Sequence, residues 1–285
     1  MRRRGGRGVT LDLAARAGPV SEVPGVEGDE ADRRRALLAH ALLEQGAPLP
    51  PEGVHAMTRG AEHIVGGLRH ADLVAGALRA AGGEMAGVAD GLDFGCSSGR
   101  VVRALAGAYP DVAWRACDPN RGAIAWASEH LRGIDFFVAP LDPPLPVDDR
   151  TLDLVVAISI WSHYGPGAAT RWLEEMHRIV KPGGHLFLTV HGAHSLALFA
   201  RERLRDDDLL ARAAAGLQAD GHFFHDEFGD AGDEGLVHPE WGLAFLTLEW
   251  LAVKATPDWS IAYYAPGAAD GNQDVVVLRR GSSPR

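Results

Sequence analysis

Leu92-Asp-Phe-Gly-Cys-Ser-Ser-Gly-Arg100 is the stretch of sequence that decides the fold. Its first residues are typical of a buried strand, and its glycines allow a tight turn into a helix that begins near Arg100. Only a residue without Cβ lets backbone amides approach a bound ligand closely, so Gly95 and Gly99 predict a ligand-binding turn. The stretch therefore indicates a strand-loop-helix unit that holds a nucleoside-containing small molecule.

Short apolar runs alternate with amphipathic ones on both sides of this stretch, which is the pattern of βαβ units. This pattern predicts strands over residues 91–94, 113–117, 136–138, 152–158 and 185–190, and helices over residues 100–108, 122–131 and 168–180. Residues 181–184 predict a tight turn, and residues 259–264 and 274–278 predict an antiparallel hairpin. We expect an α/β, doubly wound, Rossmann-like sheet of seven mostly parallel strands that ends in a C-terminal antiparallel hairpin.

Two regions are expected outside this core, an N-terminal region and an insertion before the C-terminal hairpin. Residues 1–60 are interpreted as an N-terminal leader followed by a helical substrate or lid segment, with a helix over residues 31–44. A second helix is expected over residues 61–80, at the start of the main domain. The arginines at its start indicate a frayed terminus rather than a nucleic-acid arm. Residues 61–285 are expected to form the main domain, with a lid insertion at 193–258 that is helical over 195–217 and a loop over 220–240.

Composition narrows the function classes. The 285 residues carry a formal net charge of −10, which disfavours a nucleic-acid partner. The two cysteines, Cys96 and Cys117, do not make a disulfide framework, and no apolar run has the length of a membrane span. We therefore expect a cytoplasmic protein that acts on small molecules, with no membrane or nucleic-acid partner, and a homo-oligomer is compatible with the sequence.

An acidic residue follows the next predicted strand. Asp118 lies in Ala-Cys-Asp-Pro-Asn, where a carboxylate can accept both hydroxyls of a ribose. Pro140 and Leu141 follow the third strand, where an adenine can be held between apolar side chains and backbone groups. Residues 153–159 end at Ser159, at the mouth of the expected cleft. Separate strand ends thus converge on one nucleoside.

These motifs, in this order and spacing, resemble the class I S-adenosylmethionine-dependent methyltransferases over residues 60–192. The resemblance implies S-adenosyl-L-methionine as cofactor, with Gly95 and Gly99 under its methionine part, Asp118 on its ribose, Leu141 near its adenine and Asp93 near its amino group. It extends the cofactor-binding set to Cys96, Ser97, Pro119, Asn120, Pro140 and Ser159. One departure is Ser97, since many relatives have glycine at this position.

Methyl transfer requires alignment of the acceptor and removal of a proton, and it requires no metal in principle. His163 and His191 follow predicted strands at the edge where open α/β sheets bind ligands, so both are candidate bases, with a structural role as the alternative for each. Trp161 and Tyr164 are interpreted as substrate-contacting cleft walls. His222, His225, Asp226, Glu227 and His238 could suggest a metal site, but their spacing favours a solvated loop.

Other classes share parts of this pattern. Gly95-Cys-Ser-Ser-Gly99 also matches the G-x-S-x-G elbow of a serine hydrolase, in which Ser97 would be the nucleophile. A nicotinamide-dependent dehydrogenase would require G-x-G-x-x-G. A methyltransferase-like binding subunit without turnover is a further alternative. We favour methyl transfer to an oxygen or nitrogen of a small molecule in secondary or glycan metabolism.

Overall fold

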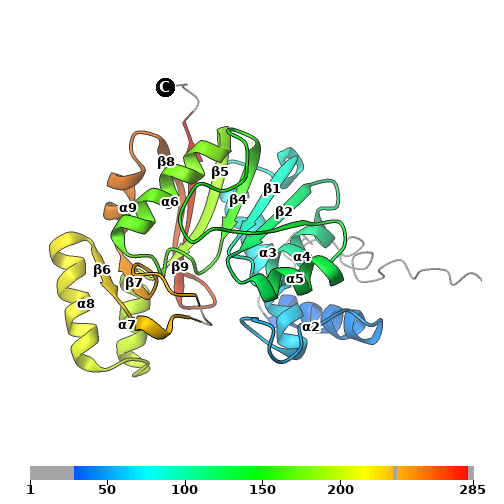
Figure 1. Cartoon of the computed structure of the whole chain (residues 1–285), viewed down its shortest axis with the longest axis horizontal. Helices are drawn as coiled ribbons and strands as arrows, with labels where there is room; N and C mark the ends of the chain where they lie inside the picture. Colours follow the sequence, from blue (N-terminus) through cyan, green and yellow to red (C-terminus); the bar gives the residue numbers. More distant parts are fainter. Residues whose placement is uncertain (1–28, 234–235, 282–285) are drawn as a thin grey trace, which may run out of the picture. The chain divides into compact units, whose positions relative to one another are not determined.

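The computed structural model describes residues 29–233 and 236–281, drawn in colour in Figure 1. The predicted leader and the arginine-rich start lie outside the described residues. The chain divides into two compact units, one of Met1–Gly76 with Met85–Val138 and one of Ala77–Glu84 with Ala139–Arg285. The predicted boundary at residue 60 stays a prediction.

The first unit is a βαβ arrangement that contains the stretch of residues 92–100. Strands β1 and β2 pair in parallel from Asp90 with Ala113 to Phe94 with Cys117, and β2 pairs in parallel with β3. Asn120 caps the helix after β2, because its side chain accepts a hydrogen bond from the Ala123 N–H. The elements of this unit are α2 (Asp29–Glu44), most of α3 (Gly60–Ala80), η2 (Met85–Gly87), β1 (Asp90–Phe94), α4 (Arg100–Ala108), β2 (Ala113–Asp118), α5 (Arg121–His130) and β3 (Asp135–Val138).

The second unit combines a parallel pair with the predicted hairpin. Strand β4 is parallel to β5, β5 is antiparallel to β9, and β9 is antiparallel to β8. A separate antiparallel pair, β6 with β7, lies in the same unit. The elements are β4 (Leu152–Ala157), α6 (Pro166–Ile179), β5 (Val180–Val190), α7 (Ala193–Arg201), α8 (Asp207–Asp220), β6 (His222–His225), η3 (Gly229–Ala231), β7 (Leu243–Leu246), α9 (Leu248–Ala255), β8 (Trp259–Ala269) and β9 (Gln273–Arg280).

The strand orders β3-β2-β1 and β4-β5-β9-β8 together account for the seven strands of the sheet. The predicted fold class, a doubly wound, mostly parallel sheet with a C-terminal antiparallel hairpin, is confirmed. Cys96 and Cys117 are both free and buried.

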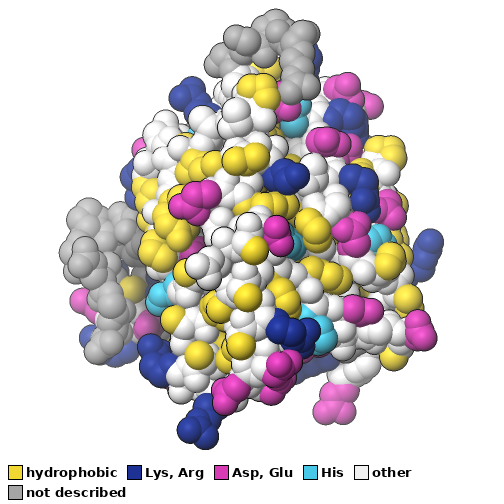
Figure 2. Space-filling model, turned by 90° about the vertical axis from the view of Figure 1, so that its left-hand side faces the viewer, with side chains coloured by type: hydrophobic (Ala, Val, Ile, Leu, Met, Phe, Trp, Pro, Cys, Tyr) yellow, Lys and Arg dark blue, Asp and Glu magenta, His cyan; other side chains and the backbone are white. Residues whose placement is uncertain are grey.

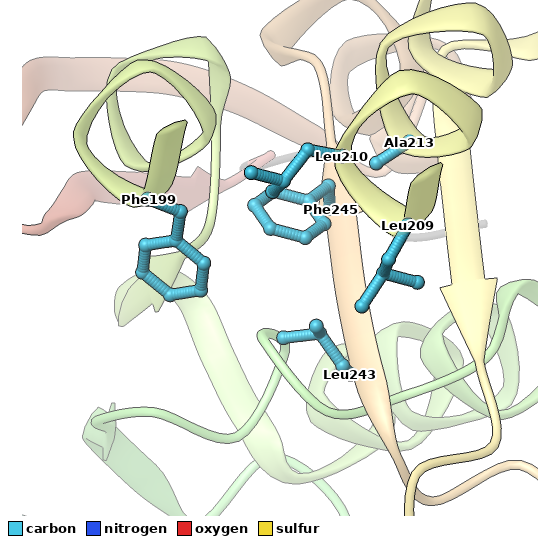
Figure 3. Packing of buried hydrophobic residues seen from close by; sticks show 6 residues of the cluster. All are labelled: Phe199, Leu209, Leu210, Ala213, Leu243 and Phe245. Carbon is cyan, nitrogen blue, oxygen red and sulfur yellow. The ribbon is translucent and has the colours of Figure 1, made fainter. Parts of the chain in front are cut away.

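The insertion after β5 differs from its prediction. The helix expected over residues 195–217 is two helices, because Asp206 accepts a hydrogen bond from the Leu209 N–H and so caps a new helix. The loop expected over residues 220–240 contains strand β6, which pairs with β7. Leu210 on α8 and Phe245 on β7 belong to one apolar cluster, which explains why the segment folds as a packed layer (Figure 3). The cluster consists of Phe199, Leu209, Leu210, Ala213, Leu243 and Phe245.

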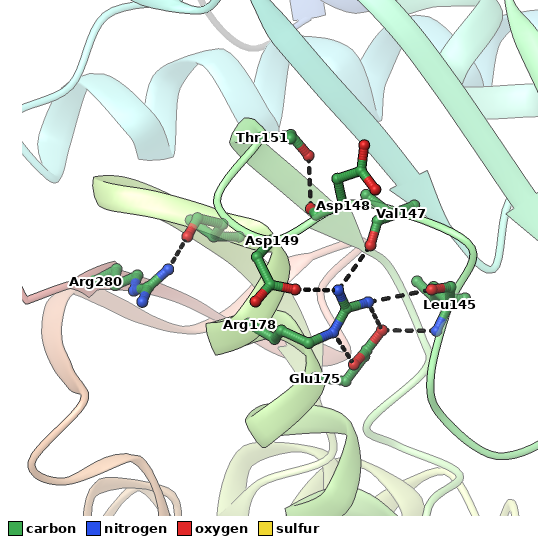
Figure 4. A network of polar contacts seen from close by, with 9 residues as sticks. Leu145, Val147, Asp148, Asp149, Thr151, Glu175, Arg178 and Arg280 are labelled. Atoms are coloured by element: carbon green, nitrogen blue, oxygen red, sulfur yellow. Dashed lines mark hydrogen bonds and ion pairs between the residues drawn. The ribbon is translucent and has the colours of Figure 1, made fainter. Parts of the chain in front are cut away.

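The turn expected at residues 181–184 is also wrong in part, since these residues lie within β5. The pairing with β4 shifts register between Leu152 and Leu154, so the glycines form an irregularity in the strand rather than a separate turn. Nearby, Arg178 donates hydrogen bonds to Glu175 and to the Leu145 carbonyl oxygen (Figure 4). These bonds tie the segment before β4 to the last turn of α6.

The described surface carries charges of both signs. Figure 2, turned toward the side of α8 and β6, shows acidic and basic side chains interspersed with apolar ones. None of the helices within residues 29–233 and 236–281 combines the length and the apolar character that a bilayer crossing requires.

Candidate functional site

The loop after β1 has the backbone that the sequence predicted. Gly95 and Gly99 have φ angles of +80° and +81°, in the left-handed region that favours glycine. The N–H groups of Gly95 and Cys96 both donate to the Cys117 carbonyl oxygen, at 2.8 and 3.0 Å, which holds the loop on the end of β2. A Cβ at Gly99 would lie 2.6 Å from a methyl group of Leu131. Glycine is therefore required here by both conformation and space.

Asp118 is a buried carboxylate at the carboxyl end of β2. Its Oδ2 accepts a hydrogen bond from the Ser97 N–H at 2.8 Å, and its Oδ1 accepts one from the Asn120 N–H at 2.8 Å. A carboxylate offers about four acceptor positions, so these contacts are compatible with hydroxyl donors of a ligand. Asp118 thus joins the loop after β1 to the loop after β2, in which Pro119 lies.

Asp93 lies beneath the same loop. Its side chain is 2% exposed, and its Oδ2 accepts a hydrogen bond from the Val102 N–H in the first turn of α4 at 3.1 Å. Burial raises the pKa of this carboxyl to about 7, against the lowering effects of Arg100 and of the Val102 hydrogen bond. In this structure Asp93 braces the start of α4.

Ser97 makes a contact that sequence reasoning missed. Its φ is +50°, its Oγ lies 2.8 Å from Nδ1 of His55, and the same hydroxyl donates to the His55 carbonyl oxygen at 3.1 Å. His55 precedes α3 in a segment without periodicity, so no local pattern marks it. The serine that departs from the family pattern is therefore held in place by a histidine 42 residues earlier.

Ser159 belongs to a buried network in the second unit. Its N–H donates to Oγ1 of Thr189 at 2.7 Å, and Thr189 donates to Oε1 of Gln273 at 2.5 Å. The Gln273 amide donates in turn to Oγ of Ser159 at 2.8 Å. The ends of β4, β5 and β9 are thereby linked. Pro140 and Leu141 lie in the same unit, with Leu141 38% exposed.

His191 has both ring nitrogens engaged. Nδ1 lies 3.3 Å from the Ala244 carbonyl oxygen, so it carries the proton, and Nε2 lies 3.2 Å from the Gln273 amide nitrogen, which donates to it. Burial, with a smaller contribution from His163, lowers the pKa of His191 to about 3. The ring is neutral and fixed.

His163 has a different arrangement. Nδ1 lies 2.6 Å from the Gly242 carbonyl oxygen and therefore carries the proton, which leaves Nε2 as an acceptor. The ring stacks on Trp241 at 4.8 Å and lies 6.5 Å from Phe228. Burial lowers the pKa of His163, while Asp233 raises it. A half-buried neutral imidazole with a basic nitrogen is suited to accept a proton.

Trp161 and Tyr164 lie in the interior of the second unit. Trp161 is 0% exposed, and its indole N–H donates to the Ala169 carbonyl oxygen. Tyr164 is 7% exposed and stacks on Trp172. In this structure both support the loop that carries His163, and their contact with a substrate stays a prediction.

The acidic and histidine-rich residues of the insertion are dispersed. His222 lies against Trp250, whereas His238 lies 3.3 Å from Asp142. Within residues 29–233 and 236–281, no three His, Cys, Asp or Glu side chains are grouped as a metal site would require.

A part of the chain is similar to known methyltransferases. Residues 92–184 match the methyltransferase domain family. A curated malonyl-[acyl-carrier protein] O-methyltransferase of Alcanivorax borkumensis is 34% identical over 109 residues, which are 37% of this chain and 36% of that protein. The match thus spans about a third of the curated relative.

Two solved structures align with this chain, and one of them has a TM-score above 0.5. The [4+2]-cyclase SpnF has a TM-score of 0.52 and 15% identity, and the alignment covers 89% of this chain and 96% of that chain. A SAM-dependent methyltransferase from Methanosarcina mazei has a TM-score of 0.49 and 21% identity, covering 68% and 93%. Residues 92–184 of the chain are thus similar to a methyltransferase domain, and its relatives include an O-methyltransferase and a SAM-dependent methyltransferase.

Proposed function

We propose that this protein transfers the methyl group of S-adenosyl-L-methionine to an oxygen or nitrogen of a small molecule in secondary or glycan metabolism. The observation that carries the proposal is His163, whose Nδ1 is fixed by the Gly242 carbonyl oxygen while Nε2 is an acceptor. The aromatic rings beside it, Trp241 and Phe228, suit a small organic acceptor better than a macromolecule. We further propose that it acts in the cytoplasm.

The residues of the first unit fit the cofactor. The left-handed backbone at Gly95 and Gly99 keeps side chains out of the turn, and Asp118 presents a carboxylate at the end of β2. We assign Asp118, with Pro119 and Asn120, to the ribose, and the loop of Gly95 to Gly99 to the methionine part. The buried Oγ of Ser98, in the same loop, has no hydrogen-bond partner, which supports a polar ligand there.

Within this function the two histidines have separate roles. S-adenosyl-L-methionine supplies an activated methyl group, so the chain must orient the acceptor and take its proton. His163 accepts that proton at Nε2, and its pKa, lowered by burial, keeps it neutral at physiological pH. His191 positions the network of Gln273 and Ser159, because both of its nitrogens are engaged. We expect Pro140, Leu141 and Ser159 to contact the cofactor.

The relatives support this proposal to different degrees. The name of the curated relative describes an O-methyltransferase, which favours oxygen as the methylated atom. SpnF, a [4+2]-cyclase, shares the fold, so the fold alone does not fix the reaction.

The test therefore follows the methyl group itself. The full chain is incubated with cofactor carrying a labelled methyl group and a panel of small hydroxylated and amino compounds, with His163→Gln as the matched variant. Transfer of label that falls with the variant supports the proposal. Product formation without label, or transfer that is unchanged in His163→Gln, contradicts it.

A further inference from the structure

The side chain of Asp233 contacts the aromatic group around His163. Its Oδ2 accepts a hydrogen bond from the indole N–H of Trp241 at 3.1 Å. The Trp241 ring in turn stacks on His163, with ring centroids 4.8 Å apart, and Phe228 lies 6.5 Å from His163. Asp233, Trp241, Phe228 and His163 are all half-buried, so each keeps part of its surface open to a ligand. These four residues are called the Asp233 cluster below.

Asp233 is a carboxylate without a cationic partner in the described part of the chain. Within residues 29–233 and 236–281 it makes no salt bridge, and the indole N–H that donates to it is uncharged. The neighbouring His163 is neutral, because burial above all lowers its pKa. A half-buried carboxylate gains stability from a positive partner. The Asp233 cluster therefore lacks a positive charge that a ligand can supply.

The other charged groups near His163 neutralise each other. Glu227 and Arg205 form a salt bridge, in which Oε1 lies 2.8 Å from Nη2. After burial and the hydrogen bond to Gly242, the pKa of His163 responds to Asp233 and Glu227, which raise it, and to Arg205, which lowers it. All three charges thus act on the same ring. Since Glu227 is paired with Arg205, Asp233 is left as the net negative charge.

A carboxylate beside aromatic rings is the combination that suits an organic ammonium ion. The ring faces attract a cation, and the carboxylate adds a charge-assisted hydrogen bond. We propose that the Asp233 cluster binds an acceptor that carries a positively charged amino group, with Asp233 on the ammonium group and Trp241 and Phe228 against its carbon skeleton. This inference rests on the proposed function and names the class of its acceptor, a small organic cation.

Three probes that share one body and differ in charge test the proposal. Tyramine, 4-propylphenol and 3-(4-hydroxyphenyl)propionate each carry a short chain on a phenol ring, and the chain ends in an ammonium, a methyl and a carboxylate group respectively. Titration calorimetry measures the binding of each probe to the full chain at neutral pH. Tyramine is expected to bind at least about tenfold more tightly than 4-propylphenol, as for a hydrogen bond between charged groups. The propionate is expected to bind most weakly, because Asp233 repels it.

Asp233→Asn is the variant that isolates the charge, since it keeps an oxygen that can accept the Trp241 indole N–H. It is expected to lower the affinity for tyramine about tenfold and to change that for 4-propylphenol less than about twofold. Asp230→Asn is the matched control, because it removes the same charge from an exposed position in the same segment. We expect it to leave all three affinities unchanged. Far-ultraviolet circular dichroism confirms that each variant is folded, and if Asp233→Asn does not fold, the order of the probes on wild type decides.

Equal affinities for tyramine and 4-propylphenol, no detectable binding of tyramine, or an undiminished preference in Asp233→Asn would overturn the inference. The labelled-methyl assay separates this failure from that of the proposed function. Label that goes to neutral compounds in preference to cationic ones supports methyl transfer and overturns the inference. Tyramine that binds through Asp233, without transfer of label to any compound, contradicts the proposed function alone.

Discussion

The hydroxyl of Ser97 lies 2.8 Å from Nδ1 of His55, a contact that joins the loop after β1 to the segment before α3. Ser97 also has a left-handed backbone conformation that costs a residue other than glycine on the order of 1 kcal/mol. The contact therefore stabilises a loop conformation that is unfavourable for serine by itself.

His55→Ala is expected to lower the affinity for S-adenosylhomocysteine several-fold, because the loop loses its hydrogen bond and must be ordered by the ligand. Ser97→Ala removes the other partner, so the double variant should lose little more than either single variant. Calorimetric titration of the three variants measures this coupling. Strictly additive losses would show that the two residues act independently.

Gly99→Ala is expected to destabilise the protein by about 2 to 4 kcal/mol, since it combines backbone strain with a clash. The clash would be with Leu131, 2.6 Å from the added Cβ. Gly133→Ala is the matched control, because Gly133 has a φ of +82° and open space around it. Urea denaturation should show a smaller loss for Gly133→Ala, and equal losses would mean that the clash with Leu131 is absent.

Three buried histidines predict a loss of stability at acid pH. The pKa values of His63, His191 and His222 are lowered from 6.5 to about 4, 3 and 4, with burial the first cause of each. At acid pH the unfolded chain binds protons that these buried rings exclude in the folded chain. The contribution of the three histidines to the free energy of unfolding is therefore fully present above pH 6.5 and is lost as the pH drops toward about 4.

Urea midpoints measured between about pH 7.5 and pH 5 check this sign. His191→Leu should reduce the dependence on pH. Asp93 acts in the opposite direction, because its raised pKa favours the folded state at low pH. Wild type and variant share Asp93, so its effect cancels in the comparison. An unchanged slope in His191→Leu would contradict the buried neutral ring.

His163→Gln is expected to lower kcat about 10²- to 10⁴-fold if Nε2 accepts the acceptor's proton. Wild-type kcat should fall only below pH 6.5, since activity needs the neutral ring and burial lowers the pKa of His163. His191→Gln should lower the free energy of unfolding and leave the shape of the pH profile of kcat largely unchanged. A pH profile that changes with His191 and not with His163 would reverse the assignment of the base.

The local signals in the sequence were sufficient for the first unit of the fold. Gly95, Gly99 and Asp118 follow strands with simple apolar patterns, and their geometry depends on residues within one βαβ unit. The insertion was less predictable, because β6 and β7 are formed by pairing across a long separation and by burial of Phe245. His55 was missed for the same reason, since its partner Ser97 is 42 residues away.

The assignment of Asp118 to the cofactor ribose is the claim on which the proposed site depends most. Titration of S-adenosylhomocysteine into wild type and Asp118→Ala, both verified as folded, tests it directly. We predict stoichiometric binding to wild type and at least about a tenfold loss of affinity in the variant, as for removal of a charged hydrogen-bond acceptor. Equal affinity for the two proteins would contradict the account.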